Sequence, residues 1–157
     1  MMFMNQAFNS ALRAAAHDDV PIGAVIVRNG KIIARGENQV QKKKNPTLHA
    51  EIVAINRACK KLETKFLDDC DIYVTLEPCA MCATAISLAR IRGVYYAAAD
   101  EKGGGIAHNA KIYETDKHLW RPTVTQLPEY AATSAKMLRE FFAIRRKQKT
   151  ANNSPFF

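Results

Sequence analysis

Two short segments of this 157-residue sequence carry side chains that could bind one metal ion together. One is the His-Ala-Glu segment at 49–51, and the other is the Pro-Cys-Ala-Met-Cys segment at 78–82. Each is predicted at the start of a helix, where the helix dipole and the free backbone N–H groups favour a thiolate over a thiol. Cysteines three residues apart lie on the same side of a first helical turn, so Cys79 and Cys82 can reach one ion. His49, at the other helix start, supplies a third ligand.

This three-ligand interpretation competes with a closed structural zinc site, which needs a fourth protein ligand. Cys59 lies further along the same predicted helix as His49, about 15 Å away at 1.5 Å per residue. Cys70 precedes a predicted strand whose far end carries Cys79, so it is expected at the opposite edge of the sheet. The same distance estimate does not exclude three further histidines as a fourth ligand, although none lies in a ligand-like motif: His17, His108 and His118. The sequence therefore favours an open coordination position, as in a catalytic zinc site.

Glu51 stands just beyond His49 and is free to act on a substrate instead of binding the metal. A zinc ion with two thiolates and one imidazole is close to neutral, and it lowers the pKa of a bound water toward ~7. The Glu51 carboxylate can take up the proton of that water, pass it to a ring nitrogen of a base and later protonate departing ammonia. These residue types therefore predict hydrolytic deamination with one Zn²⁺ ion in each subunit.

An H-x-E segment followed by P-C-x-x-C is the signature of zinc nucleobase deaminases. Each half alone has an ordinary explanation, because a His-Ala-Glu segment is usually incidental and a C-x-x-C pair also occurs in redox sites and structural zinc sites. Both halves in this order, each at a predicted helix start, favour a deaminase. A competing interpretation is a non-catalytic RNA-binding or scaffold subunit that keeps the zinc. Such a subunit is expected to lack a proton shuttle, whereas Glu51 is present.

Length and composition fit one deaminase domain, expected over residues 1–149 and followed by a loose tail over 150–157. The formal net charge of +8 is consistent with a polyanionic partner such as nucleic acid. No apolar run approaches the ~20 residues of a membrane span, and the first residues lack the pattern of a signal peptide. A cytoplasmic protein with no membrane partner and with free or metal-bound thiols is therefore expected.

Hydrophobic periodicity predicts alternating helices and strands. Helices are expected over 3–16, 47–61, 80–89 and 129–147, with a short helix over 109–115. Strands are expected over 22–27, 31–34, 71–76, 93–98 and 123–127. Asn29-Gly30 predicts a hairpin turn, and Thr47 is the expected N-cap of the second helix. Strands separated by helices predict a three-layer α/β fold with one antiparallel hairpin at its start.

Longer stretches resemble the bacterial tRNA-specific adenosine deaminases. The stretches that carry the resemblance are 20–25, 45–52, 73–82, 89–92, Asp100 with Lys102-Gly103, and Phe141-Phe142 followed by Arg145-Arg146. The similarity covers most of the chain from Ala11 to Lys147. It implies the cytidine deaminase-like α/β fold, a three-layer α-β-α sandwich with a mixed five-stranded sheet. It also implies a homodimer that converts the wobble adenosine of a tRNA anticodon stem-loop to inosine.

The same resemblance implies metal ligation by His49, Cys79 and Cys82 and proton transfer by Glu51. Asn38 matches the asparagine that hydrogen-bonds the target base in this family, although a plain turn asparagine is an equally good interpretation. Asp100 matches an acidic position near the nucleic-acid groove, and the alternative for it is a surface or capping role. From geometry, the backbone amide of Ala50 is expected to face the leaving group.

Two basic clusters are expected to contact RNA. Lys42, Lys43 and Lys44 directly precede the His-Ala-Glu helix, and Arg145 and Arg146 lie near the end of the last helix. In recognition of this kind the base is splayed from a single-stranded loop, while Lys and Arg hold the phosphates. Solvated helix ends would look the same in sequence.

The stretch 104–128 resembles the family only loosely, and selectivity for the substrate is expected to depend on it. The alternative function is therefore deamination of free bases or nucleosides of the guanine or cytosine type. The zinc signature does not separate the two substrates, and the basic last helix favours tRNA.

Overall fold

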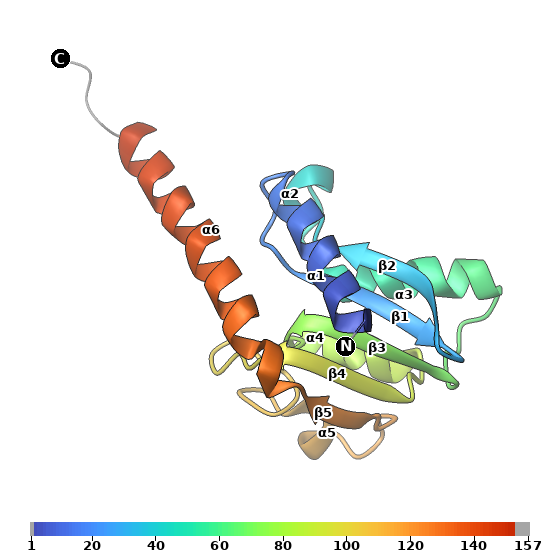
Figure 1. The fold of residues 1–157 in the computed structure, drawn as a ribbon. Helices are drawn as coiled ribbons and strands as arrows, with labels where there is room; N and C mark the ends of the chain where they lie inside the picture. The colour runs from blue at the N-terminus through green and yellow to red at the C-terminus, as the bar shows by residue number, and fades with distance from the viewer. Residues whose placement is uncertain (1, 153–157) are drawn as a thin grey trace.

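Five strands form one mixed sheet between two layers of helices (Figure 1). The computed structural model describes residues 2–152. In chain order the strands are β1 (Gly23–Arg28), β2 (Lys31–Glu37), β3 (Cys70–Leu76), β4 (Gly93–Ala98) and β5 (Thr123–Gln126). Their order across the sheet is β2-β1-β3-β4-β5. The three-layer α/β class with a mixed five-stranded sheet is therefore confirmed.

The pairing of the strands brings three chain segments to one edge of the sheet, namely the edge at which β2, β3 and β4 end. β1 is antiparallel to both β2 and β3, whereas β4 is parallel to β3 and to β5. The hairpin between β1 and β2 turns at Asn29 and Gly30, which both have positive φ angles as a type I′ turn requires. Because β2, β3 and β4 all run the same way, the residues that follow them emerge at the same end of the sheet.

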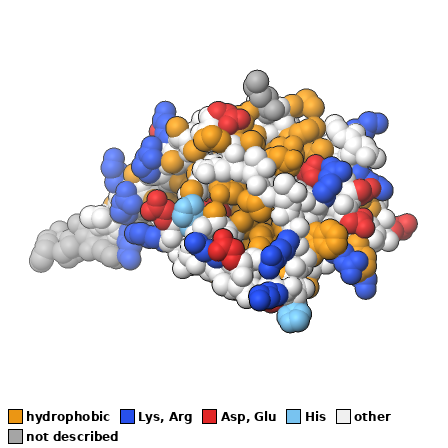
Figure 2. Space-filling model, turned by 90° about the horizontal axis from the view of Figure 1, so that it is seen from below, with side chains coloured by type: hydrophobic (Ala, Val, Ile, Leu, Met, Phe, Trp, Pro, Cys, Tyr) orange, Lys and Arg blue, Asp and Glu red, His pale blue; other side chains and the backbone are white. Residues whose placement is uncertain are grey.

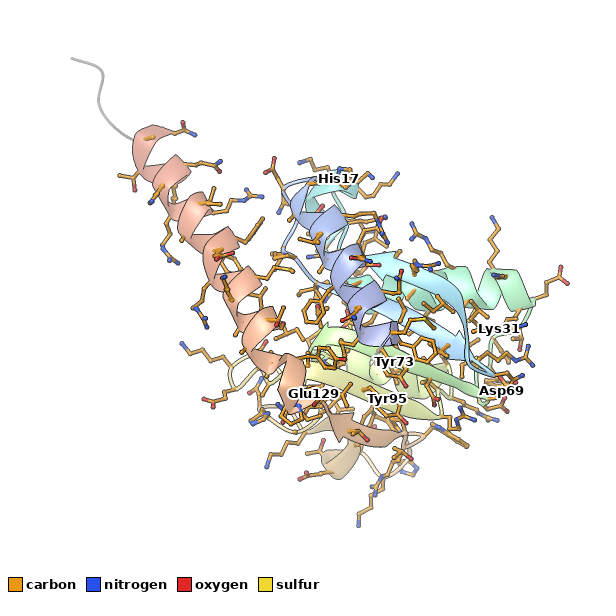
Figure 3. All side chains as sticks on the ribbon, viewed as in Figure 1. His17, Lys31, Asp69, Tyr73, Tyr95 and Glu129 are labelled. Atoms are coloured by element: carbon orange, nitrogen blue, oxygen red, sulfur yellow. The ribbon has the colours of Figure 1, made fainter. Side chains whose placement is uncertain are left out.

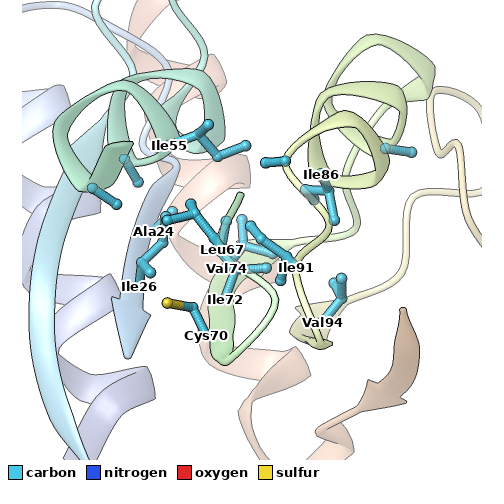
Figure 4. Close-up of a cluster of buried hydrophobic side chains, with 14 of the residues drawn as sticks. Ala24, Ile26, Ile55, Leu67, Cys70, Ile72, Val74, Ile86, Ile91 and Val94 are labelled. Atoms are coloured by element: carbon cyan, nitrogen blue, oxygen red, sulfur yellow. The ribbon is translucent and has the colours of Figure 1, made fainter. Parts of the chain in front are cut away.

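One face of the sheet is covered by α3 (Ala50–Leu62) and α4 (Ala80–Leu88), with the short α5 (Ile112–Thr115) beside them. The core here combines alternate strand residues with the apolar sides of the two helices (Figure 4). Its fully buried side chains include Ile26, Ile72, Val94 and Ile86. Burying each such side chain stabilises the fold by about 1.5–3 kcal/mol, so this packing holds both helices in place.

The opposite face carries α1 (Met2–Ala15) and the first turns of α6 (Ala131–Asn152). Tyr73 and Tyr95 stack there from neighbouring strands with ring centroids 4.6 Å apart (Figure 3). The Ser134 hydroxyl anchors α6 by donating to the carbonyl oxygen of Thr75 at 2.5 Å. The later turns of α6 extend away from the sheet (Figure 1). The 3-10 turn Pro128–Tyr130 leads into this helix.

The predicted N-cap at Thr47 is wrong, because α3 begins at Ala50 with His49 in the N-cap position. The Asn45 side chain accepts hydrogen bonds from both the backbone N–H and the hydroxyl of Thr47, at 3.0 and 2.8 Å. Thr47 is thereby held in a turn before the helix. As a result the metal-ligand candidate itself occupies the helix start.

A short helix, α2 (Val40–Lys43), lies in the polar stretch where no helix was predicted. The buried carboxylate of Asp19 accepts the backbone N–H groups of Gln41 and Lys42 at 2.6 and 3.0 Å. An acidic side chain at a helix start compensates for the free N–H groups there, which explains a helix with few apolar residues.

The last helix is longer than predicted. It continues to Asn152, so the expected loose tail is wrong for residues 150–152. The remainder of that tail, 153–157, lies outside the described residues. Among the described helices, none is both long enough and apolar enough to cross a membrane.

Replacing Gly36 with Ala tests the close approach of β2 and α3. An added Cβ atom would lie 2.1 Å from the carbonyl oxygen of Ala50 and 2.6 Å from the backbone nitrogen of Ala54. The helix must shift, and Gly36→Ala is expected to lower the free energy of unfolding by about 2–3 kcal/mol. Urea denaturation measures the change, and Lys31→Ala, on the exposed start of the same strand, is the control. Equal stability of Gly36→Ala and the parent would contradict the packing described.

Candidate active site

The structure brings His49, Cys79 and Cys82 together at the edge where the strands end. His49 and Cys79 occupy the N-cap positions of α3 and α4, and Cys82 lies in the first turn of α4. The His49 Nδ1 atom is 3.6 Å from the sulfur of each cysteine. The three donor atoms all lie within 4.8 Å of one another. The three candidate ligands from sequence are therefore neighbours in space.

The spacing of these donor atoms fits a tetrahedral zinc ion. Zn–S bonds of about 2.3 Å and Zn–N bonds of about 2.0–2.1 Å at tetrahedral angles place nitrogen and sulfur roughly 3.5–3.6 Å apart. The observed separation is 3.6 Å. Within residues 2–152, no fourth His, Cys, Asp or Glu belongs to this group. The donor set therefore fits a site with three protein ligands and one open position.

The electrostatics of the cysteine pair favour cation binding. A hydrogen bond from the Cys82 thiol lowers the pKa of Cys79 to about 4, against the effect of burial, and His49 lowers it further. The same contact with Cys79, together with burial, raises the pKa of Cys82. The contact with Cys79 also raises the pKa of His49. One sulfur is thus a ready thiolate, and a cation among the three donors would displace the remaining protons.

Glu51 lies in the first turn of α3, next to the candidate metal ligands. Its residue is only 3% exposed, and burial raises the pKa of its carboxyl group. In the part of the chain that the structure describes, its Oε2 atom has no hydrogen-bond partner. Leaving a buried acceptor unpaired costs about 1–3 kcal/mol, so such an atom is a candidate for contact with a substrate or water.

Asn38 follows β2 at the same edge of the sheet. Its backbone N–H donates to the carbonyl oxygen of Ile22 at 3.1 Å, which fixes the residue next to the hairpin. Its side-chain Oδ1 atom is buried and, like the Oε2 atom of Glu51, has no hydrogen-bond partner among the described residues. A turn asparagine would usually bond its own loop, so the unpaired oxygen favours a binding role over the turn interpretation.

Ala50 begins the helix that carries Glu51, whereas Asp100 lies in the loop after β4. Ala50 is fully buried as the first residue of α3. The Asp100 carboxylate accepts the backbone N–H groups of Lys102 and Gly103 at 3.3 and 2.9 Å. Asp100 therefore has the capping role that was its alternative interpretation, and a contact with RNA remains a prediction.

The two predicted basic clusters lie on different elements. Lys42 and Lys43 belong to α2 and Lys44 ends it, and all three are exposed. The Arg145 guanidinium bonds the carbonyl oxygen of Asp18 and lies 5.2 Å from the ring centre of Phe141. Arg146 is exposed on the part of α6 that extends beyond the sheet. Figure 2 shows basic side chains at that end of the molecule, and others over the rest of the same face.

Sequence reasoning missed Glu77, a buried carboxylate between β3 and the metal-ligand turn. Burial raises its pKa, but hydrogen bonds from Asp100, His108 and Ala107 outweigh burial and lower the pKa below the ordinary value. The position of His108 could not be estimated from its place in the sequence. In the structure its ring bonds this carboxylate, and it does not belong to the group of His49, Cys79 and Cys82. The signal in the sequence was a glutamate directly before the Pro-Cys pair.

Comparison with known proteins gives the family. The model of the MafB19-like deaminase family matches residues 1–146. The tRNA-specific adenosine deaminase of Aquifex aeolicus is 42% identical over 142 residues, covering 89% of this chain and 91% of that protein. The corresponding enzyme of Bacillus subtilis is 40% identical over 152 residues, covering 96% and 92%. The chain belongs to the tRNA-specific adenosine deaminase family.

Solved structures place this deaminase in the same fold. A structure from a study of A-to-I editing by tRNA:A34 deaminases is 42% identical, has a TM-score of 0.84, and covers 87% of this chain and 99% of its own. A guanine deaminase from Bacillus subtilis is 37% identical, has a TM-score of 0.62, and covers 92% of both chains. The cytidine deaminase-like architecture implied by the sequence is thereby confirmed.

Metal analysis tests the three-ligand cluster of this deaminase. The parent protein is expected to hold about one zinc ion per chain, whereas Cys82→Ser should lose most of it because serine is a poor zinc ligand. Elemental analysis after dialysis measures both. Cys59→Ser, in the last turns of α3, is the control and should keep its zinc. Full zinc occupancy in Cys82→Ser would contradict this assignment of the site.

Proposed function

We propose that this chain is a zinc-dependent hydrolase that deaminates the wobble adenosine of a tRNA anticodon to inosine, releasing ammonia. The observation that carries the reaction type is the buried Glu51 oxygen beside the cluster of His49, Cys79 and Cys82, an oxygen that has no hydrogen-bond partner among the residues that the structure describes. Relatives 40–42% identical over about nine-tenths of the chain, each a tRNA-specific adenosine deaminase, support the substrate.

His49, Cys79 and Cys82 would hold the zinc through one nitrogen and two sulfurs. Bound there, zinc supplies Lewis-acid chemistry that lowers the pKa of water toward ~7. Because the two thiolates largely neutralise the cation, the site suits an uncharged base. Each ligand sits at or near a helix start, which fixes its direction before a substrate arrives.

Glu51 moves the protons in this mechanism. Its carboxylate accepts a proton from the attacking water and delivers it to a ring nitrogen of the base. It then takes up the second proton of the added water and passes it to the amino group, which departs as ammonia. The burial that raises its pKa suits both steps, because the group holds an acquired proton more readily than an exposed glutamate does. Because its Oε2 atom has no partner in the described part of the chain, one oxygen is left for this exchange.

Substrate contacts complete the proposal. The buried Asn38 side chain would hydrogen-bond the target base, and the Ala50 backbone N–H would face the leaving group. Asp100 would lie at the rim of the pocket, where its cap shapes the loop that follows β4. Lys42, Lys43 and Lys44 would hold phosphates near the entrance, with Arg145 and Arg146 of α6 as further RNA contacts.

A homodimer is the proposed assembly. Helix α4 carries no charged side chain, whereas a surface helix normally turns a polar face to water. Its outer side and α3 line a groove in which the apolar residues Ile55, Cys59, Ala85, Leu88 and Ala89 are flanked at one end by Glu63, Thr64 and Lys65. Leu88 is 68% exposed, so a second copy covering this groove would remove apolar surface from water. The proposed location is the cytoplasm, because tRNA is the proposed substrate and a reducing compartment keeps thiols free or bound to metal.

The substrate is tested by incubating purified protein with transcribed tRNA and reading the wobble position by sequencing. Inosine at that position is expected, with little ammonia released from free guanine or cytidine. Free guanine is the second candidate substrate, favoured by the 37% identity to a guanine deaminase. Rapid ammonia release from guanine without editing of any tRNA would overturn the proposed substrate but leave the reaction type intact.

Replacing Glu51 with Gln removes the proton shuttle and keeps the shape of the side chain. The expected result is a fall in kcat by a factor on the order of 10²–10⁴ with zinc retained, because proton transfer by a positioned group contributes that much. Glu63→Gln, an exposed change at the end of α3, is the matched control. A scaffold protein would show no activity in either the parent or the variant, and that result would reject an enzyme altogether.

Replacing all three lysines 42–44 with Ala separates RNA binding from chemistry. The expected result is a raised KM for tRNA and a flatter dependence of log KM on log salt, by up to ~0.7 per lost phosphate contact. The value of kcat should change little, because the lysines lie outside the metal cluster. Steady-state kinetics at several salt concentrations measures both. An unchanged salt slope would assign these lysines to a solvated helix end.

A further inference from the structure

The loop at 100–108 is tied to the metal-ligand turn by one buried side chain. Glu77 is two residues before Cys79, and its side chain is completely buried. Its Oε1 atom accepts backbone N–H groups from three consecutive residues at 2.8–3.3 Å: Ile106, Ala107 and His108. Its Oε2 atom accepts the Asp100 backbone N–H at 3.1 Å and contacts the His108 ring at 2.7 Å. One carboxylate therefore fixes both ends of the loop.

Glycines let this loop lie directly on the backbone of the metal-ligand turn. The Gly105 N–H donates to the carbonyl oxygen of Pro78 at 2.8 Å. A Cβ atom at Gly105 would lie 2.5 Å from the carbonyl carbon of Cys79, and one at Gly104 would lie 2.6 Å from a Glu77 oxygen. There is no room for side chains at either position. The loop is therefore part of the wall next to the candidate metal site.

His108 is the polar side chain whose direction this arrangement sets. A carboxylate is an acceptor only, so the His108 Nδ1 atom carries the hydrogen in its contact with Glu77. The Nε2 atom, which has no hydrogen-bond partner within residues 2–152, is left as an acceptor. The side chain is 35% exposed. Lys102 of the same loop and Lys111 just after it are exposed and basic, as expected of a surface that meets RNA.

We propose that Glu77 is a positioning residue that holds the 100–108 loop against the metal-ligand turn and thereby presents the Nε2 atom of His108 to the RNA backbone beside the target nucleoside. This inference rests on the proposed function, because it requires an RNA substrate. With the hydrogen on Nδ1, the Nε2 atom is an acceptor and can bond the hydrogen of a 2′-hydroxyl, a group that RNA offers at every nucleotide. The ring needs no reordering on binding, because Glu77 already holds it.

The test is steady-state kinetics on a synthetic anticodon stem-loop containing the wobble adenosine. His108→Ala is expected to raise KM roughly 3- to 10-fold, the range for loss of one hydrogen bond, with kcat, zinc content and melting temperature close to the parent. His108→Gln can still donate to Glu77 and should recover part of the loss. His118→Ala, another exposed histidine whose side chain has no such tie to Glu77, is the control and should leave KM unchanged.

A second variant separates positioning from simple support of the fold. Glu77→Gln keeps an acceptor for the three backbone N–H groups of 106–108 and loses the oxygen that the His108 ring shares with the Asp100 N–H, so KM should rise without loss of zinc. The double variant Glu77→Gln with His108→Ala should be no worse than Glu77→Gln alone, since residues acting through one contact are not additive. If Glu77→Gln fails to fold, the two His108 variants still decide the question.

Several outcomes would overturn the inference. An unchanged KM in His108→Ala would do so, and so would a fall in melting temperature together with zinc loss, which would mark a purely structural pair. The parent protein distinguishes this failure from failure of the proposed function. If the parent edits the stem-loop and only the His108 effect is missing, the inference alone is lost. If the parent leaves RNA unedited and acts on guanine, both are lost.

Discussion

The arrangement on which the rest of the structure depends is the meeting of two helix starts at one edge of the sheet. Three donor atoms must lie within reach of one ion, and the His49 nitrogen stands 3.6 Å from both cysteine sulfurs. Neither helix alone supplies this set. The common direction of β2, β3 and β4 delivers the start of α3 and the start of α4 to the same place. The apolar core beneath both helices then fixes their separation.

Buried polar groups around this edge divide into two kinds by their partners. Asp19 and Glu77 are buried carboxylates whose oxygens accept several backbone N–H groups, so they hold α2 and the 100–108 loop in place. Glu51 and Asn38 each keep one buried oxygen without a partner among the described residues. A fold tolerates the destabilising effect of such unpaired atoms where a substrate or water supplies the missing hydrogen bond. This contrast supports the proposal that Glu51 and Asn38 contact the substrate, whereas Asp19 and Glu77 position the chain.

Much of the fold and of the candidate site was predictable because it depends on residues that lie close together in the sequence. Apolar periodicity located the five strands and the main helices, and Asn29-Gly30 located the hairpin. The three candidate ligands were found because their spacing is short and each lies at a helix start. The errors arose where partners are distant in sequence. Asp19 stabilises α2 from more than twenty residues away, and Glu77 meets His108 across 31 positions. The prediction of an N-cap at Thr47 was wrong because the Thr47 hydroxyl donates to the side chain of Asn45, two residues earlier in the chain.

The proposed mechanism requires three protein atoms to bind zinc and leave one position for solvent. X-ray absorption spectroscopy on the zinc-loaded protein measures this most directly. The expected spectrum has two sulfur atoms at about 2.3 Å and two nitrogen or oxygen atoms at about 2.0–2.1 Å, of which only one belongs to an imidazole. A third sulfur or a second imidazole around the metal would mean that the site is closed by protein, and it would contradict the account.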